Sequence, residues 1–332
     1  MNPQELFRQE QNVPEKEGMV AEDILDREAF LSKKELIMEK YEDVINWREK
    51  KYNQDIAEEP SREGMRFDLD VHNRIVLDYA IKLIEVENLG QQEKVEAIMA
   101  TIMHDGGKLS SNLLEHHEKG VEYAGEMLKE MIGKKIDGIE ITKEIAQKIK
   151  EAIDRHMNHP FVVMMNKGNE FPVPKDNVDK VVFDADMLAN IGFKNVAFRI
   201  KNEGFLEKDF MRAKDGNVLE ESFRNVLEGE ITNDGKKIPG ASGLKDVMLS
   251  DSAKKMADKL IEDAEKIFEN LKKNGTIIRI QNFFSDNDGN FNPATIKERG
   301  GAELVKKLLN EEIEKSAMEL GIETIIAEKF KM

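Results

Sequence analysis

Apolar residues recur at the spacing of an amphipathic helix along most of this 332-residue chain. One such row runs through Ile145, Ile149 and Ile153, with charged residues of both signs between them. Apolar residues make up 40% of the chain and charged residues 35%, so a sizeable core can form beneath solvated helix faces. The pattern therefore predicts an all-α fold.

Breaks in the helical pattern predict where this fold divides. Pro60 and Gly64 interrupt residues 53–64, which we expect to be a linker. The linker would separate a helical N-terminal arm, residues 1–60, from a central helical domain, residues 61–273.

The last part, residues 274–332, is expected to be a small C-terminal appendage. Its segment 275–284 is rich in β-branched and aromatic residues and follows a turn, which predicts a short strand. Residues 301–321 carry the pattern of an amphipathic helix. Because amphipathic helices outside a catalytic unit commonly contact partners, a homo-oligomer formed through the terminal helices is one expectation.

Charge and composition exclude several classes of function. The net charge of −16 argues against binding to nucleic-acid polymers or anionic membranes, because both need a basic protein surface. No apolar run approaches the ~20 residues of a membrane span, and the N-terminal residues lack the apolar core of a signal peptide. We therefore expect a soluble cytoplasmic protein, in which a local basic pocket for a small anion stays possible.

Histidines, rather than cysteines, mark the candidate site. The chain has no cysteine, which excludes disulfides, thiolate metal sites and cysteine nucleophiles. All of its six histidines lie within residues 72–159. They are His72, His104, His116, His117, His156 and His159.

Several of these histidines lie on apolar helix stripes. His72, His104 and His156 each lie on such a stripe or at its end, so each is expected to point toward the core. Buried imidazoles need partners, and several that converge from separate helices satisfy one another best around a metal ion. Asp186 lies in a nearly all-apolar helix, where a carboxylate is costly unless a cation compensates it.

A single buried histidine is more often a hydrogen-bonded core residue than a metal ligand, and only the combination favours a metal site. Imidazole and carboxylate ligands without sulfur suit one or two divalent ions of Mn, Fe, Ni, Mg or Zn. In the sequence HDGGK, Asp105 has two oxygens and can bridge two ions. Gly106 and Gly107 are expected to leave the backbone open there, and Lys108 can hold a phosphate as a point charge.

Five short motifs follow one another along the central part of the chain. They are His72 on an early helix, HDGGK at 104–108, HHEKG at 116–120, RHMNH at 155–159 and DADML at 184–188. Together they resemble the HD-domain superfamily of metal-dependent phosphohydrolases, in the HDxGK form of its HDIG and HD-GYP branches. The resemblance covers roughly residues 65–273, where the later helices resemble those of stand-alone bacterial HD hydrolases. It implies a helical bundle around a metal centre.

The resemblance also implies two ion sites that share one carboxylate. The first site would use His72, His104, Asp105 and Asp186, and the second would use Asp105, His116 and His156. His116 is preferred to His117 because the family places its histidine four residues before a glycine. Asp184 would support the ligands from behind. Asp105 and Lys108 would take part in catalysis, with Lys108 on the substrate phosphate.

The chain departs from the family pattern in two places. The two-metal branches usually have adjacent histidines near position 156, whereas this chain has Met157. Either His159 supplies the missing ligand or the second ion is held weakly. The GYP segment of cyclic-di-GMP phosphodiesterases is absent after residue 159, which counts against that substrate.

The resemblance therefore predicts a phosphohydrolase that cleaves a nucleotide or a similar small phosphate ester by means of a metal-activated water. Arg155 is a further candidate for phosphate binding, although an exposed arginine is the ordinary interpretation. Two alternatives stay open: a di-iron oxygenase with the same ligand types, and a non-catalytic module that senses a nucleotide.

Overall fold

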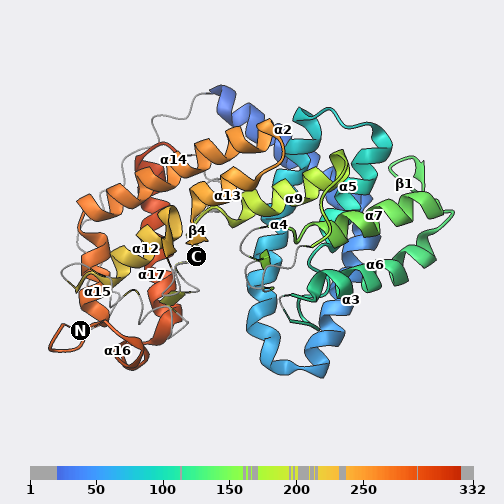
Figure 1. The fold of residues 1–332 in the computed structure, drawn as a ribbon. Coiled ribbons are helices and arrows are strands. Elements are labelled where there is room, and N and C mark those ends of the chain that lie inside the picture. The colour runs from blue at the N-terminus through green and yellow to red at the C-terminus, as the bar shows by residue number, and fades with distance from the viewer. Residues whose placement is uncertain are drawn as a thin grey trace.

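The computed structural model describes residues 21–112, 114–159, 162–163, 166, 171–193, 196, 199–200, 209, 213, 216–231, 237–289 and 291–322 (Figure 1). Over these residues the protein is mostly helical, and its strands form only two short hairpins. The expectation of an all-α fold is confirmed at this level. Among the same residues, no helix is both long enough and apolar enough to cross a membrane.

The chain up to Asn190 contributes the helices that bear the histidines or pack around them. They are α2 (Ala21–Lys40), α3 (Glu42–Glu58), the 3-10 turn η1 (Pro60–Arg62), α4 (Glu63–Val86), α5 (Gln91–Met103), α6 (His116–Met131), α7 (Lys143–Arg155) and α9 (Asn177–Asn190). A small antiparallel hairpin of β1 (Lys135–Ile136) and β2 (Ile139–Glu140) connects α6 to α7.

The second half packs beside the first. It contains α12 (Val218–Glu228), α13 (Ala241–Val247), α14 (Asp251–Lys273), α15 (Thr276–Phe284), α16 (Pro293–Glu298) and α17 (Gly301–Glu319). The antiparallel strands β3 (Gly229–Ile231) and β4 (Lys237–Pro239) link α12 to α13. In Figure 1 these helices form the left half, and α9, α13 and α14 join them to the histidine-bearing helices on the right.

One hydrophobic core runs through both halves. It extends from Tyr41 and Val44 beside α3, through α4, α5, α7 and α9, to Ile313 and Ala317 in α17. The core therefore shows no break at residue 60 or at residue 273, and the predicted domain boundaries there stay predictions.

The predicted strand at 275–284 is wrong, because residues 276–284 form helix α15. The side chains of Ile277, Ile280, Gln281 and Phe284 are buried. Their spacing of three and four residues is that of one helix face. Gly275, with φ of 67°, separates α15 from α14. Burial of this face outweighs the β-propensity of the isoleucines.

The predicted linker at 53–64 is also wrong. Helix α3 continues to Glu58, and α4 begins at Glu63. Pro60 is the first residue of the short 3-10 turn between them, a position that proline tolerates because it needs no N–H there. The arm is thus directly joined to the central helices.

Candidate metal centre

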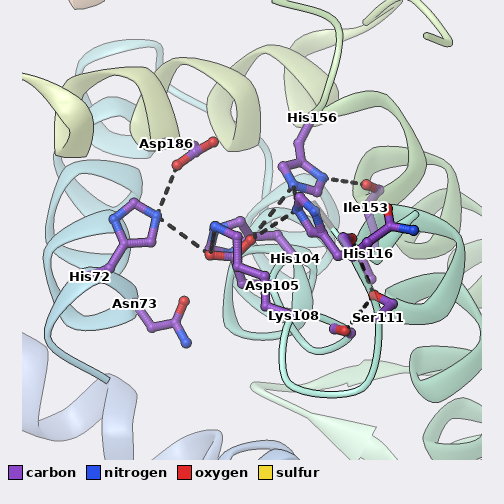
Figure 2. A network of polar contacts seen from close by, with 12 residues as sticks. His72, Asn73, His104, Asp105, Lys108, Ser111, His116, Ile153, His156 and Asp186 are labelled. Atoms are coloured by element: carbon purple, nitrogen blue, oxygen red, sulfur yellow. Dashed lines mark hydrogen bonds and ion pairs between the residues drawn. The ribbon is translucent and has the colours of Figure 1, made fainter. Parts of the chain in front are cut away.

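Five elements bring the candidate ligands together in the interior. His72 comes from α4 and Asp186 from α9. His104 and Asp105 follow the end of α5, and the remaining two histidines are the first residue of α6, His116, and the residue after α7, His156. All six side chains are buried, and Figure 2 shows them facing a common centre.

The ligand atoms fall into two sets of three. Atoms of His72, His104 and Asp186 lie within 4.8 Å of one another. Atoms of Asp105, His116 and His156 also lie within 4.8 Å of one another. Both sets combine imidazole nitrogens with a carboxylate oxygen, which suits a divalent transition metal.

Asp105 lies between the two sets. Its Oδ2 atom is 3.5 Å from His72 Nε2 and 3.4 Å from His104 Nε2. Its Oδ1 atom is 3.3 Å from His116 Nε2 and 3.8 Å from His156 Nε2. The two oxygens of one carboxylate therefore face different histidines, as a bridging ligand requires.

The imidazole rings are oriented by main-chain carbonyls. His104 Nδ1 lies 2.7 Å from the Thr101 carbonyl oxygen, and His156 Nδ1 lies 2.5 Å from that of Ile153. If each Nδ1 donates to its carbonyl, each neutral ring presents an unprotonated Nε2 toward the centre. Such a carbonyl contact is the usual outer support of a metal-binding histidine.

These Nε2 atoms have few donors to satisfy them. His104 Nε2 is buried and has no hydrogen-bond partner among the described residues. His116 Nε2 and His156 Nε2 lie 3.1 Å apart, within hydrogen-bond distance of each other. A cation in the centre would offer His104 Nε2 a partner, and the residues therefore fit a metal ion.

The charges at the centre agree with this fit. Burial alone would raise the pKa of Asp105, but the neighbouring His104 and Lys108 hold that pKa well below its ordinary value. Asp186 is likewise buried, and its contact with His72 lowers its pKa. Burial and the neighbouring imidazoles lower the pKa of His156. These shifts favour Asp105 and Asp186 as carboxylates and His156 as a neutral imidazole, which are the forms that bind metals.

Lys108 adds a fixed positive charge beside the shared carboxylate. Its Nζ lies 2.6 Å from Asp105 Oδ2, and its side chain is 26% exposed. Burial would lower the pKa of Lys108, but Asp105 and Asp186 outweigh that effect and raise it. The ammonium therefore stays charged at the edge of the cluster.

Gly107 serves packing rather than an open backbone, which corrects the expectation from the sequence. A Cβ atom at this position would lie 2.4 Å from the His116 carbonyl oxygen and 2.8 Å from the Gly120 nitrogen. The turn after α5 thus presses directly on the first turn of α6. This close approach brings Asp105 and His116 together.

His117, to which His116 is preferred as a ligand, and Asp184, predicted to support the ligands, both have their contacts outside the centre. His117 points to Asp154, with 3.8 Å between its Nε2 and a carboxylate oxygen, and its ring meets Phe171 edge-on. Asp184 accepts the N–H groups of Leu249 and Ser250 at 2.7 and 2.9 Å, at the start of α14. It therefore anchors the start of α14, and the predicted support of the ligands is not among its hydrogen bonds.

Two residues that follow His156 in the sequence lie outside the two sets of three. His159 supplies no atom to either set of three, although burial lowers its pKa to about 4 and the charges of Asp186 and Lys108 act on it. Met157 packs in a small apolar cluster with Val162 and Phe171.

The guanidinium of Arg155 is bound by two carboxylates. It lies 2.8 Å from Asp179 and 2.9 Å from Glu151. Both ion pairs engage the guanidinium in the folded protein. A role for Arg155 in substrate binding stays a prediction.

Three residues that support the centre were not predicted from the sequence: Arg48 and Tyr52 of α3 and Asn73 of α4. Arg48 and Tyr52 donate hydrogen bonds to carbonyls of the ligand-bearing turn. The detectable signal was their position four residues apart, in line with Val44, on the face that α3 buries.

Comparison with known proteins gives no relative: no family model, no curated protein and no solved structure matches the chain.

Proposed function

We propose that this chain is a metal-dependent phosphohydrolase with an HD-type centre, acting on a nucleotide or another small phosphate ester. The observation that carries the proposal is the position of Asp105. Its two oxygens face two histidine sets, and Lys108 contacts the same carboxylate. A shared carboxylate flanked by a fixed cation suits the transfer of a phosphoryl group.

The candidate residues would bind the ions and the substrate phosphate separately. His72, His104 and Asp186 would hold one divalent ion, His116 and His156 the other, and Asp105 both. Ions bound in such a centre acidify water and neutralise charge on phosphoryl oxygens. Lys108 would bind a phosphoryl oxygen of the substrate as a point charge.

A di-iron oxygenase is the second candidate, because Asp105, His116 and His156 offer three ligand atoms for a second ion without a ligand from position 157. Lys108 favours the hydrolase over this candidate. Its ammonium lies against the shared carboxylate, where an anionic phosphoryl group needs a cation.

The test combines metal content with turnover. Protein purified without chelator is measured by mass spectrometry for bound metals and is then assayed on a panel of nucleotides and a generic phosphodiester. We expect bound divalent metal and phosphate-ester cleavage. Lys108→Met should bind metal but lose most turnover, whereas Lys266→Met, on the exposed face of α14, should match the wild type.

Two results would contradict the proposal. Protein free of metal even after incubation with Mn²⁺ would remove its basis. Two bound irons with oxygen consumption and no cleavage of any ester would move the assignment to the oxygenase.

A further inference from the structure

Helix α3 buries polar side chains against the turn that carries the His-Asp pair. The buried residues of α3 are Val44, Arg48, Tyr52 and Asp55, at the spacing of a single helix face. That face packs on α5 and α6. A buried helix face is ordinarily apolar, so three polar residues there call for a specific explanation.

Part of the explanation lies at the end of α5. The last carbonyls of a helix have no partner within it. In α5, the His104 ring contacts the Thr101 carbonyl, and the Gly106 N–H bonds the Met103 carbonyl. The carbonyl between them, that of Ile102, accepts a hydrogen bond from Arg48 Nη1 at 3.2 Å. A side chain of α3 thus completes the cap from which Asp105 projects.

Tyr52 holds the main chain of Asp105 itself. Its hydroxyl donates to the Asp105 carbonyl oxygen at 3.3 Å and accepts from Asn73 Nδ2 at 3.1 Å. Tyr52 has no exposed surface, and Asn73 is 3% exposed. Asn73 directly follows the ligand His72 in α4. The hydroxyl therefore connects the helix that bears His72 to the turn that bears Asp105.

We propose that Tyr52, Asn73 and Arg48 are positioning residues that fix Asp105 so that its carboxylate serves both ion sites. The inference rests on the proposed metal centre. An aspartate side chain has only two torsions, so the place of its main chain decides where its oxygens lie. Since the Asp105 oxygens face both sets, displacement of its main chain should weaken both ions together, whereas loss of a single histidine should weaken one.

The test is a titration of the metal-free full-length protein with Mn²⁺, in which calorimetry and electron paramagnetic resonance measure the bound ion. Tyr52→Phe should weaken the binding of each ion by about 10-fold, the lower end of the effect of outer-support residues on metal affinity. Tyr41→Phe is the matched control. It removes another buried hydroxyl, one that has no hydrogen-bond partner among the described residues, and it should bind Mn²⁺ like the wild type.

A double variant separates positioning from general stability. Tyr52→Phe leaves the amide of Asn73 without an acceptor, which by itself destabilises the fold. Tyr52→Phe combined with Asn73→Leu removes both partners and should recover the unfolding temperature, while Mn²⁺ affinity stays low. Affinity that recovers together with stability would overturn the positioning role.

Variants of Arg48 test the same positioning role independently if the Tyr52 variants do not fold. Arg48→Met should weaken Mn²⁺ binding, and Arg48→Lys, which keeps a donor and a positive charge, should recover most of it. Wild-type affinity for both ions in Tyr52→Phe and Arg48→Met would overturn this inference and leave the proposed function standing. Absence of Mn²⁺ binding by the wild type would overturn both.

Discussion

The cluster around Asp105 and the network around Arg199 are both buried and both built from charged side chains, but they differ in how their hydrogen bonds are completed. The Arg199 guanidinium donates to both carboxylate oxygens of Asp209, and the distance from its Nε atom to Oδ2 is 2.8 Å. It also donates to Glu230 at 2.6 Å. Asp209 accepts two further bonds, from Ser222 at 2.7 Å and Asn225 at 2.9 Å. Within this network the donors and acceptors are all part of the protein.

The Asp105 cluster lacks that internal balance. Four imidazole Nε2 atoms and two carboxylates converge on one space, with Lys108 as the only fixed cation in contact with them among the described residues. One buried atom there, His104 Nε2, has no hydrogen-bond partner among the described residues, and a buried polar atom without a partner is costly. Buried charge is therefore common to both clusters. What sets the Asp105 cluster apart is the convergence of imidazoles and carboxylates on one space.

The largest effect is expected from substitution of Asp105, the carboxylate between the two histidine sets. Asp105→Asn should remove tight binding of both ions and lower phosphate-ester turnover on the order of 10³-fold, because a neutral amide cannot bridge two cations. Metal analysis and a turnover assay on the same sample check this. A variant that keeps full metal content would show that Asp105 is not the shared ligand.

The matching substitution in the other network should act on stability instead. Asp209→Asn leaves Arg199 buried without its bidentate partner, and loss of one partner of a buried ion pair typically costs about 3–5 kcal/mol. Urea unfolding measures the cost. Metal content per folded chain should be unchanged, and a fall in metal content equal to that of Asp105→Asn would erase the distinction between the two clusters.

A smaller effect is expected where packing shapes the metal centre. Gly107→Ala places a methyl group against the first turn of α6 and should destabilise the protein by about 1–3 kcal/mol, with weaker Mn²⁺ binding. The control is Gly125→Ala in α6, where the added Cβ would meet only a lysine side chain at 3.7 Å. It should stabilise the helix by up to about 1 kcal/mol. Equal effects of the two variants would contradict this packing role.

The smallest expected effect is a pH slope in the metal-free protein. Burial lowers the pKa of His159 from 6.5 to about 4. Between these pH values the imidazole is therefore protonated in the unfolded chain and neutral in the folded chain. The free energy of unfolding should therefore fall as the pH falls from 6.5 toward 4, by at most about 1.4 kcal/mol per pH unit from this group. Unfolding at several pH values in His159→Gln should show a shallower slope, and an unchanged slope would exclude His159 as its source.

The helical fold and the candidate ligands were predictable for the same reason. Polar residues on apolar helix stripes, such as His72 and Asp186, must point inward, and one sequence is enough to reveal that pattern. Helix α15 shows where local preference misleads, because its isoleucines favour a strand and only burial against α12, α14 and α17 decides for a helix.

The supports of the centre could not be predicted in the same way. The contact of Tyr52 with the Asp105 carbonyl joins residues 53 positions apart. Its existence depends on how α3 packs on α5, which no local pattern encodes. Likewise, the sequence permits Asp105 to bridge, but the division of its two oxygens between two histidine sets follows from the crossing of α4, α6, α7 and the end of α5.

The convergence of five elements on one small space also has a consequence for the whole fold. The candidate ligands span residues 72–186, so an ion held by them would act as a cross-link that closes several long chain loops at once. Unfolding would release that ion, and mass action would then link the stability of the fold to metal supply. A free ion concentration 100 times its dissociation constant adds about 2.7 kcal/mol. The same cluster would in that way make the folded fraction of the chain depend on metal supply.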